Sequence, residues 1–201
     1  MVAACEKHHV KCALAHQTRY SPRVKVLREL IREGKLGDIV ELRGNGKEDP
    51  RGGGEDMMVL GTHIFDLMRH LVGDARWCFA RINQNGKKAL VSEAQQGKEP
   101  IGPILGDHIT AQFGFDGLTL GTFFTHKAKV GAGKRYGMEI RGTKGIVQTG
   151  FVRSGSSTLT IGFIHPETAE VIRLWALDAN LLHHTVEVTV WLDPKIGRAH
   201  V

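Results

Sequence analysis

Apolar residues recur at the spacing of an α-helix early in the chain. Val24, Leu27 and Ile31 follow Ser21-Pro22, and the pattern stops before Gly34. The serine can cap the helix and the proline suits its first position, where no backbone N–H is needed. The sequence therefore predicts an exposed amphipathic helix.

A second apolar face begins near Glu55 and ends near Gly73. The residues that share this side of a helix are Met57, Leu60, Gly61, Ile64, Leu67, Met68 and Leu71. Gly52-Gly53-Gly54 stand before it as a loop, and an acidic first turn suits the positive end of the helix dipole. We predict a helix that packs on the core through its apolar face.

Most of the remaining chain shows strand patterns. They cover approximately residues 39–43, 77–82, 108–115, 118–125, 136–141, 146–149 and 158–164. Asp116-Gly117 between two of these runs indicates a hairpin turn, and residues 83–106 indicate a long, polar loop that we expect to be mobile. The order of elements predicts an α+β fold, with one large, open, mostly antiparallel sheet and helices on one face.

The elements predicted at both ends of the chain lack the neighbouring elements with which they would pack. Residues 1–9 predict the last turns of an amphipathic helix without an N-cap, and residues 10–16 predict a buried strand. This is the tail of a βαβ unit, so we expect further sequence upstream. Residues 185–191 predict another strand, whereas residues 196–201 resemble a translated sequencing adapter, with a genuine short basic tail as the alternative.

The composition is that of an ordinary globular protein, with 41% hydrophobic and 24% charged residues among 201. The net charge of +6 does not predict nucleic-acid binding, because lysines and arginines are spread among acidic neighbours. No apolar run approaches the roughly twenty residues of a membrane span. Cys5, Cys12 and Cys78 form neither a CxxC nor a metal-ligand spacing, so we expect reduced thiols in the cytoplasm.

One side of the second predicted helix carries side chains suited to proton transfer. Asp56, Val59, His63, Asp66 and His70 fall near one another away from the apolar face. A histidine beside a carboxylate can carry protons near neutral pH, because its reference pKa is about 6.5 and the carboxylate stabilises the charged form. Taken alone, such a pair on a helix more often has a structural role.

The sequence predicts no metal site and no phosphate loop. There are 11 histidines, including the pairs His8-His9 and His183-His184, but adjacent side chains point in different directions and no HExxH occurs. Residues 131–137 contain glycines and a lysine without the GxGxxG spacing and precede a strand pattern, so we interpret them as a flexible turn.

Four motifs together resemble the Gfo/Idh/MocA family of NAD(P)-dependent sugar and polyol oxidoreductases. They are Arg19-Tyr20-Ser21-Pro22, Gly34-Lys35-Leu36-Gly37-Asp38-Ile39, Gly52-Gly53-Gly54 through His63 and Asp66, and Glu139-Ile140-Arg141-Gly142-Thr143-Lys144-Gly145. The resemblance spans residues 1–149. It implies that residues 1–16 end an N-terminal Rossmann domain, and that residues 17–195 form the substrate domain, whose open sheet often mediates oligomerisation.

The resemblance also implies roles for individual residues. His63 matches the histidine of the family's Asp-x-x-x-His motif, but Val59 stands at the aspartate position, so the usual dyad is broken and Asp66 is the nearer carboxylate. The implied catalytic residues are therefore His63 and Asp66. The implied substrate-binding residues are Arg19, Tyr20, Asp56, Thr62 and His126, with an interdomain contact as the alternative for Arg19 and Tyr20.

We therefore expect the substrate-binding half of an oxidoreductase that acts on a sugar, polyol or related hydroxyl or carbonyl compound. The NAD or NADP site and the family's lysine-bearing Glu-Lys-Pro motif would lie upstream of this chain, so we expect it to be inactive alone. We expect a homo-oligomer formed through the open sheet. The alternative is a noncatalytic binding or oligomerisation module, since Val59 breaks the dyad.

Overall fold

A computed structural model describes residues 1–128, 135–150, 159–164 and 171–176. The strand predicted at residues 185–191 and the tail at 196–201 lie outside the described residues, as does most of the glycine-rich turn at 131–137. Within the described part, no helix is long and apolar enough to cross a membrane.

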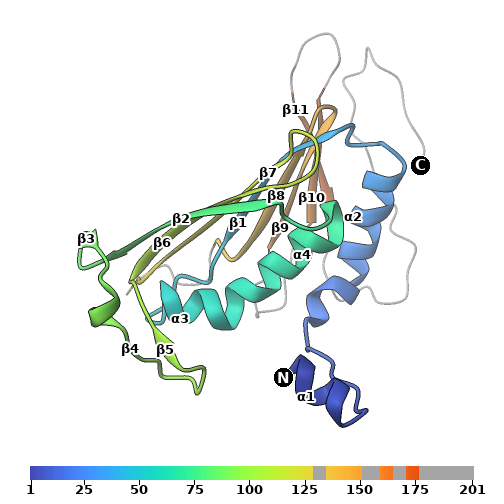
Figure 1. The fold of residues 1–201 in the computed structure, drawn as a ribbon. Coiled ribbons are helices and arrows are strands. Elements are labelled where there is room, and N and C mark those ends of the chain that lie inside the picture. The colour runs from blue at the N-terminus through green and yellow to red at the C-terminus, as the bar shows by residue number, and fades with distance from the viewer. Residues whose placement is uncertain (129–134, 151–158, 165–170, 177–201) are drawn as a thin grey trace, which may run out of the picture.

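Nine described strands form one twisted sheet in the order β11-β10-β9-β8-β1-β7-β6-β2-β3 (Figure 1). They are β1 (Ile39–Asn45), β2 (Trp77–Gln84), β3 (Lys87–Lys88), β6 (His108–Gly114), β7 (Leu120–His126), β8 (Gly137–Gly142), β9 (Gly145–Gly150), β10 (Leu159–Ile164) and β11 (Val171–Ala176). β1 pairs with β7 in parallel, and the other described neighbours in this sheet are antiparallel. The predicted open, mostly antiparallel α+β sheet is confirmed.

Helices cover one face of this sheet (Figure 1). The helical elements are α1 (Val2–Lys7), η1 (Gln17–Tyr20), α2 (Pro22–Arg32), α3 (Gly54–Asp56), η2 (Met57–Gly61), α4 (Thr62–Val72) and η3 (Val91–Glu93). The predicted cap of α2 is present, because the Ser21 hydroxyl accepts a hydrogen bond from the Val24 backbone N–H at 3.4 Å. The second predicted helix is also present. It contains a π-helical turn, η2, which the sequence pattern did not predict, and it ends at Gly73, whose backbone lies in the left-handed region.

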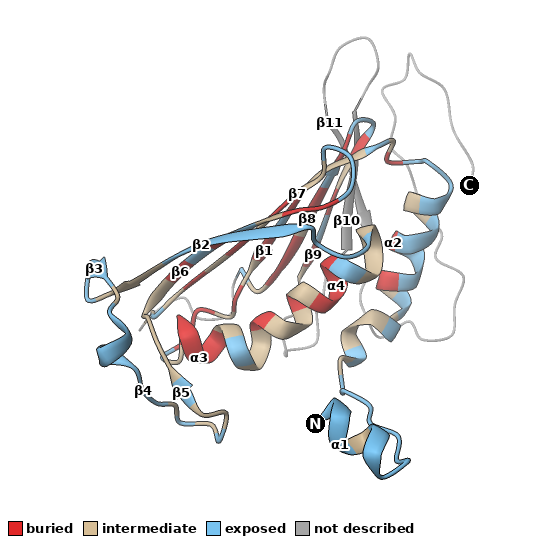
Figure 2. Ribbon diagram, in the orientation of Figure 1, coloured by how far each residue is buried: buried red, intermediate tan, exposed pale blue. Residues whose placement is uncertain are grey.

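The hydrophobic core lies between the helices and one face of the sheet (Figure 2). Its fully buried members include Val24, Leu27, Leu42, Ile64, Leu67, Met68, Phe123, Ile140 and Val147. Successive strand residues point to opposite faces, so β7 buries Phe123 and Thr125 and directs Phe124 and His126 to the other side. The helix-free side is the open face of the sheet.

Residues 10–16 form no strand, so that prediction is wrong. A strand is held by hydrogen bonds to a neighbouring strand, and none of the described strands pairs with this segment. The apolar side chains that suggested a buried strand, including Val10 and Leu14, are exposed. The segment instead connects α1 to η1 as irregular chain.

Residues 83–106 are largely irregular, as predicted, but the loop contains the short pair β4 (Gln95–Gln96) and β5 (Pro103–Ile104). It is attached to the start of α3 by two hydrogen bonds. The Glu99 backbone N–H donates to Glu55 Oε1 at 2.9 Å, and the Gly54 N–H donates to the Gly106 carbonyl at 2.9 Å. These contacts hold the loop against the first turn of the helix.

Candidate active site

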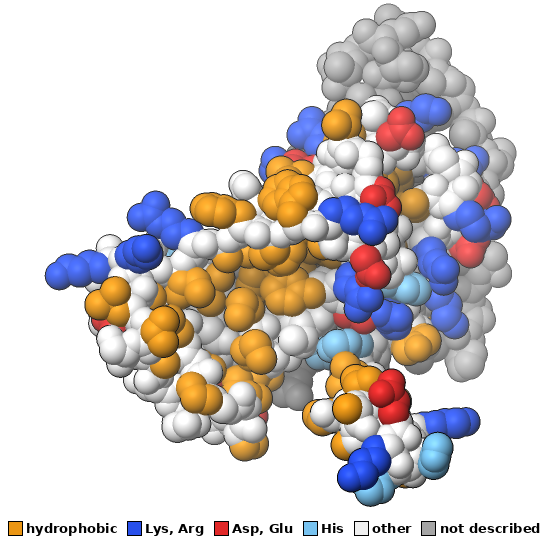
Figure 3. All heavy atoms as spheres, viewed as in Figure 1, with side chains coloured by type: hydrophobic (Ala, Val, Ile, Leu, Met, Phe, Trp, Pro, Cys, Tyr) orange, Lys and Arg blue, Asp and Glu red, His pale blue; other side chains and the backbone are white. Residues whose placement is uncertain are grey.

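An open hollow of about 480 Å³ lies between the N-terminal segment and α4. Its lining consists of Cys12, Leu14, His16, Arg19, Tyr20, Thr62, Phe65, Asp66 and Arg69. Charged side chains gather around α2 and α4 in Figure 3, beside the apolar area over the sheet. The hollow therefore combines a polar wall with apolar surface, as small-molecule sites commonly do.

Asp66 of α4 holds the polar wall together. Its carboxylate is 9% exposed and accepts hydrogen bonds from Arg19, with Nε 2.8 Å from Oδ2 and Nη2 bound to Oδ1. This two-pronged contact raises the pKa of the Arg19 guanidinium. His16 Nδ1 lies 3.3 Å from Oδ1 of the same carboxylate. One nearly buried anion thus fixes two groups that come from the segment before α2.

His63 lies one turn before Asp66 on the same helix. Its ring meets the His16 ring edge to face, with centroids 5.2 Å apart. Burial lowers the pKa of His63, proximity to His16 lowers it further, and Asp66 partly opposes the change. His63 Nδ1 is buried without a hydrogen-bond partner, since Val59 one turn earlier has no polar side-chain atom. We call His16, His63 and Asp66 the imidazole cluster.

Two further predicted residues lie at the hollow. Thr62 lines it and donates its hydroxyl to the Val59 carbonyl at 3.3 Å, so its oxygen stays available as an acceptor. Tyr20 is exposed at the rim. The structure thus brings together Arg19, Tyr20, Thr62 and Asp66, with His63 in edge-to-face contact with His16.

Asp56 does not belong to this hollow, and its expected place on the polar side of the helix is wrong. It is 0% exposed. Its carboxylate accepts hydrogen bonds from the backbone N–H groups of Lys47 and Glu48, each at 3.2 Å, and from the Thr125 hydroxyl at 2.5 Å. The prediction assumed an unbroken α-helix, whereas η2 inserts a wider turn that changes the angular spacing. Asp56 is a structural residue that anchors the loop after β1.

His126 also lies elsewhere, at the end of β7 on the open face. Its Nδ1 is 2.7 Å from Glu48 Oε1, and Arg135 donates to both oxygens of Glu48 at 2.6 and 3.0 Å. Glu48 is buried, so its charge is balanced within this group. The structure does not bring His126 to the hollow, because the strand alternation turns it to the other side of the sheet.

The sequence pattern does not indicate His16 as part of the site. The prediction of a buried strand at residues 10–16 gives no reason to place His16 near Arg19. In the structure η1 begins directly after His16, so His16 lies about one helical turn before Arg19. Cys12, Leu14, Phe65 and Arg69 were missed as well. Of these, Arg69 had a readable signal, since it follows Asp66 by three residues on the same helix.

The sequence has no GxGxxG, and residues 1–16 form one short helix and an irregular segment rather than a strand–loop–helix unit. Among the described residues, no group of three His, Cys, Asp or Glu side chains could hold a metal ion. The hollow itself offers groups that can bind and orient a polar ligand.

A family model described as the GFO/IDH/MocA C-terminal domain matches residues 24–148. The levoglucosan dehydrogenase of Pseudarthrobacter phenanthrenivorans is 23% identical over 177 residues, which are 76% of this chain and 45% of that protein. This chain thus spans about half the length of that relative.

Solved structures share the fold at low identity. An NAD binding oxidoreductase from Klebsiella pneumoniae has a TM-score of 0.60 and 19% identity, covering 85% of this chain and 48% of its own. The WlbA dehydrogenase from Bordetella pertussis, in complex with NADH and UDP-GlcNAcA, has a TM-score of 0.57 and 19% identity, covering 75% of this chain and 46% of its own.

Proposed function

The chain belongs to the Gfo/Idh/MocA family through its C-terminal domain, and on that premise we propose that it is the substrate-binding half of an NAD(P)-dependent oxidoreductase. The proposed substrate is a sugar, a polyol or a related hydroxyl or carbonyl compound. The observation that carries this proposal is the hollow beside α4, where Asp66 holds Arg19 and His16 next to His63.

The lining suits a ligand with many hydroxyl groups. Arg19 and Thr62 offer a donor and an acceptor, Tyr20 and Phe65 offer ring surface, and the imidazole cluster offers ring nitrogens and a carboxylate for proton transfer. In this proposal Arg19, Tyr20 and Thr62 bind substrate, and His63 and Asp66 belong to the proton-handling machinery. Hydride chemistry would be supplied by NAD or NADP held in an N-terminal Rossmann half.

Relatives support the substrate class. Solved structures of levoglucosan dehydrogenase are complexes with NADH and levoglucosan and with NADH and L-sorbose. Because this chain covers 46–47% of those chains, we propose that it is inactive without the other half. Cys5, Cys12 and Cys78 are free thiols, which favours the reducing cytoplasm as its location.

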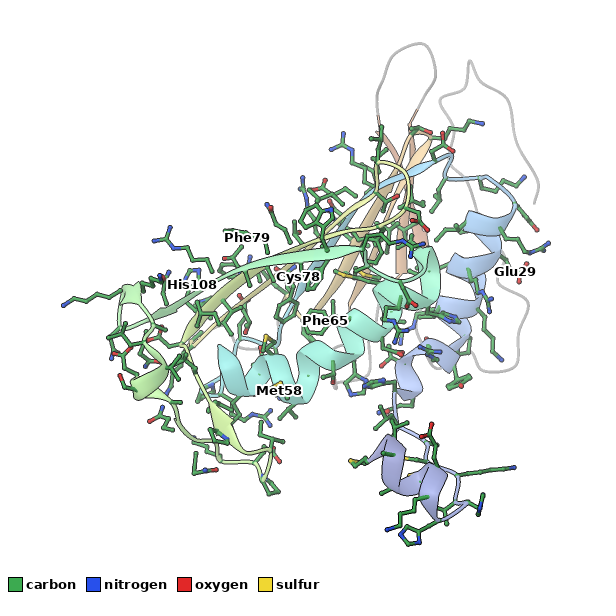
Figure 4. All side chains as sticks on the ribbon, in the orientation of Figure 1. Glu29, Met58, Phe65, Cys78, Phe79 and His108 are labelled. Carbon is green, nitrogen blue, oxygen red and sulfur yellow. The ribbon has the colours of Figure 1, made fainter. Side chains whose placement is uncertain are left out.

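We also propose that the open face joins copies of the protein. One row across this face carries Phe79, Gln112, Thr122, Arg43, Glu139 and Gln148. Arg43 lies between two carboxylates, 2.8 Å from Glu41 and 3.7 Å from Glu139, so this surface mixes both charge signs with aromatic area. Figure 4 shows Phe79 on β2, away from α4.

The second candidate is a noncatalytic binding module, favoured by Val59 and by the unpartnered His63 Nδ1. The test uses the intact protein with its upstream half, levoglucosan and L-sorbose as probes, and the absorbance of NADH or NADPH as the readout. Turnover by the intact protein, and none by residues 1–201 alone, is the expected result. Saturable sugar binding without turnover in the intact protein would replace the enzyme proposal with the binding module.

A further inference from the structure

The two imidazoles of the cluster occupy different positions relative to the hollow. His16 lines it and its side chain is 25% exposed. His63 is partly buried and is not among the lining residues, and its Nδ1 is buried without a partner. A proton acceptor must come within hydrogen-bond reach of the group that it deprotonates. His16 stands in the wall of the hollow, where a bound hydroxyl group would lie, whereas His63 does not line it.

The contact with Asp66 determines which nitrogen of His16 carries the proton. Nδ1 lies 3.3 Å from Asp66 Oδ1, and a carboxylate at that distance favours the neutral tautomer with the proton on Nδ1. The other nitrogen, Nε2, then keeps its lone pair as an acceptor. Arg19 holds both oxygens of Asp66, so the carboxylate cannot turn away from the ring. Asp66 is thus a positioning residue for His16.

We infer that His16, and not His63, accepts the proton of the substrate hydroxyl, with Asp66 fixing its tautomer and His63 supporting its ring edge to face. This inference rests on the proposed function. The substrate O–H bond breaks as the Nε2–H bond forms, and the positive charge on the imidazolium is stabilised by Asp66. The electron pair left on oxygen would form the carbonyl, and an oxidised nicotinamide dinucleotide held by the other half of the protein would accept the hydride from the same carbon.

The first experiment needs neither cofactor nor substrate. Nitrogen-15 chemical shifts of the imidazoles in the 201-residue chain report which ring nitrogen carries the proton. We expect His16 with the proton on Nδ1, and a loss of this preference in Asp66→Asn, because an amide can offer an N–H to the ring in place of a full negative charge. Exposed His8 should be unaffected by the substitution. A proton on His16 Nε2 in the unsubstituted chain would overturn the inference.

The second experiment uses the intact enzyme and compares His16→Asn, His63→Asn and His8→Asn. His16→Asn should lower kcat by about 100-fold or more, as expected for the loss of a proton acceptor. His63→Asn should lower it by less than about tenfold, and His8→Asn should not change it. A loss in His63→Asn that equals or exceeds the loss in His16→Asn would assign the role to His63 and contradict the inference.

The two experiments separate this inference from the proposed function. If the intact protein oxidises neither sugars, polyols nor related hydroxyl compounds, the proposed function fails, and the proton-transfer role of His16 fails with it. If the protein does oxidise such a compound while the tautomer or the kcat ranking is the opposite of that expected, the function stands and the assignment to His16 is wrong.

Discussion

Asp56 shows at the scale of one residue how a buried carboxylate organises a loop. It receives two backbone N–H groups and one hydroxyl, and it is inaccessible to solvent. Asp56→Asn turns one acceptor into a donor that faces other donors. We expect a loss of about 1–3 kcal/mol in the free energy of unfolding, measured by urea denaturation.

The matched control is Asp74→Asn. Asp74 is exposed and pairs with Arg69 at the end of α4, so its substitution should leave the free energy of unfolding nearly unchanged. Equal effects of the two substitutions would contradict the structural role of Asp56.

His63 should make stability depend on pH. Its pKa in the folded chain is lowered from 6.5, chiefly by burial, so the unfolded chain binds this proton at a higher pH than the folded chain does. His63 therefore leaves the free energy of unfolding undiminished above about pH 6.5 and lowers it as the pH decreases below that value. The decrease between about pH 7.5 and about pH 5.5 should be smaller in His63→Asn than in the unsubstituted chain. His8→Asn should leave the decrease unchanged, and an unchanged decrease in His63→Asn would contradict the burial of this imidazole.

The sequence located some residues of the site and could not locate others. Asp66 and Arg19 stand in regular elements or directly before one, so periodicity and the Arg-Tyr-Ser-Pro motif were informative. His16 lies in an irregular segment, whose path depends on long-range contacts rather than local pattern. Asp56 was misplaced because nothing in the local spacing indicates that a helix widens at Met57–Gly61.

At the scale of elements, α4 approaches the sheet at Gly44 of β1. A Cβ atom at Gly44 would collide with the Ile64 side chain, which is fully buried and cannot withdraw. Gly44→Ala should therefore lower the free energy of unfolding by about 1–3 kcal/mol, measured by urea denaturation. Gly97→Ala is the matched control, because a Cβ there meets its neighbours at ordinary distances of 3.4 Å or more. A neutral Gly44→Ala would mean that α4 does not pack this closely on β1.

Helices and strands of this fold were predictable where the pattern is local. The capped helix α2, the apolar face of α4 and the strands on both sides of Asp116-Gly117 all follow from spacing and turn residues. The strand prediction for residues 10–16 was wrong because an apolar run becomes a strand only when a partner strand lies beside it. The spacing within the run does not reveal whether a partner is present. Likewise, the residue pattern within β1 or β7 does not indicate that these two strands pair in parallel.

At the scale of the whole molecule, the open face predicts self-association. Phe79 is 67% exposed on this face, and a buried aromatic side chain often dominates an interface. Phe79→Asp should weaken association by about tenfold or more, measured by sedimentation velocity over a range of concentrations. Leu118→Asp, at an exposed position in the turn after β6, should have no such effect. Equal association constants for the two variants would exclude this region of β2 from the interface.

The central position of β1 also has a consequence for synthesis. β1 pairs Glu41 with Leu120 of β7 and Arg43 with Glu139 of β8, so both partners follow it by roughly 80 residues or more. A ribosome adds about 5–20 residues per second, so the first of these partners is made about 4–16 seconds after β1. Until then both edges of β1 carry unpaired backbone groups, and the nascent chain presents a strand that chaperones or other unfinished chains can bind.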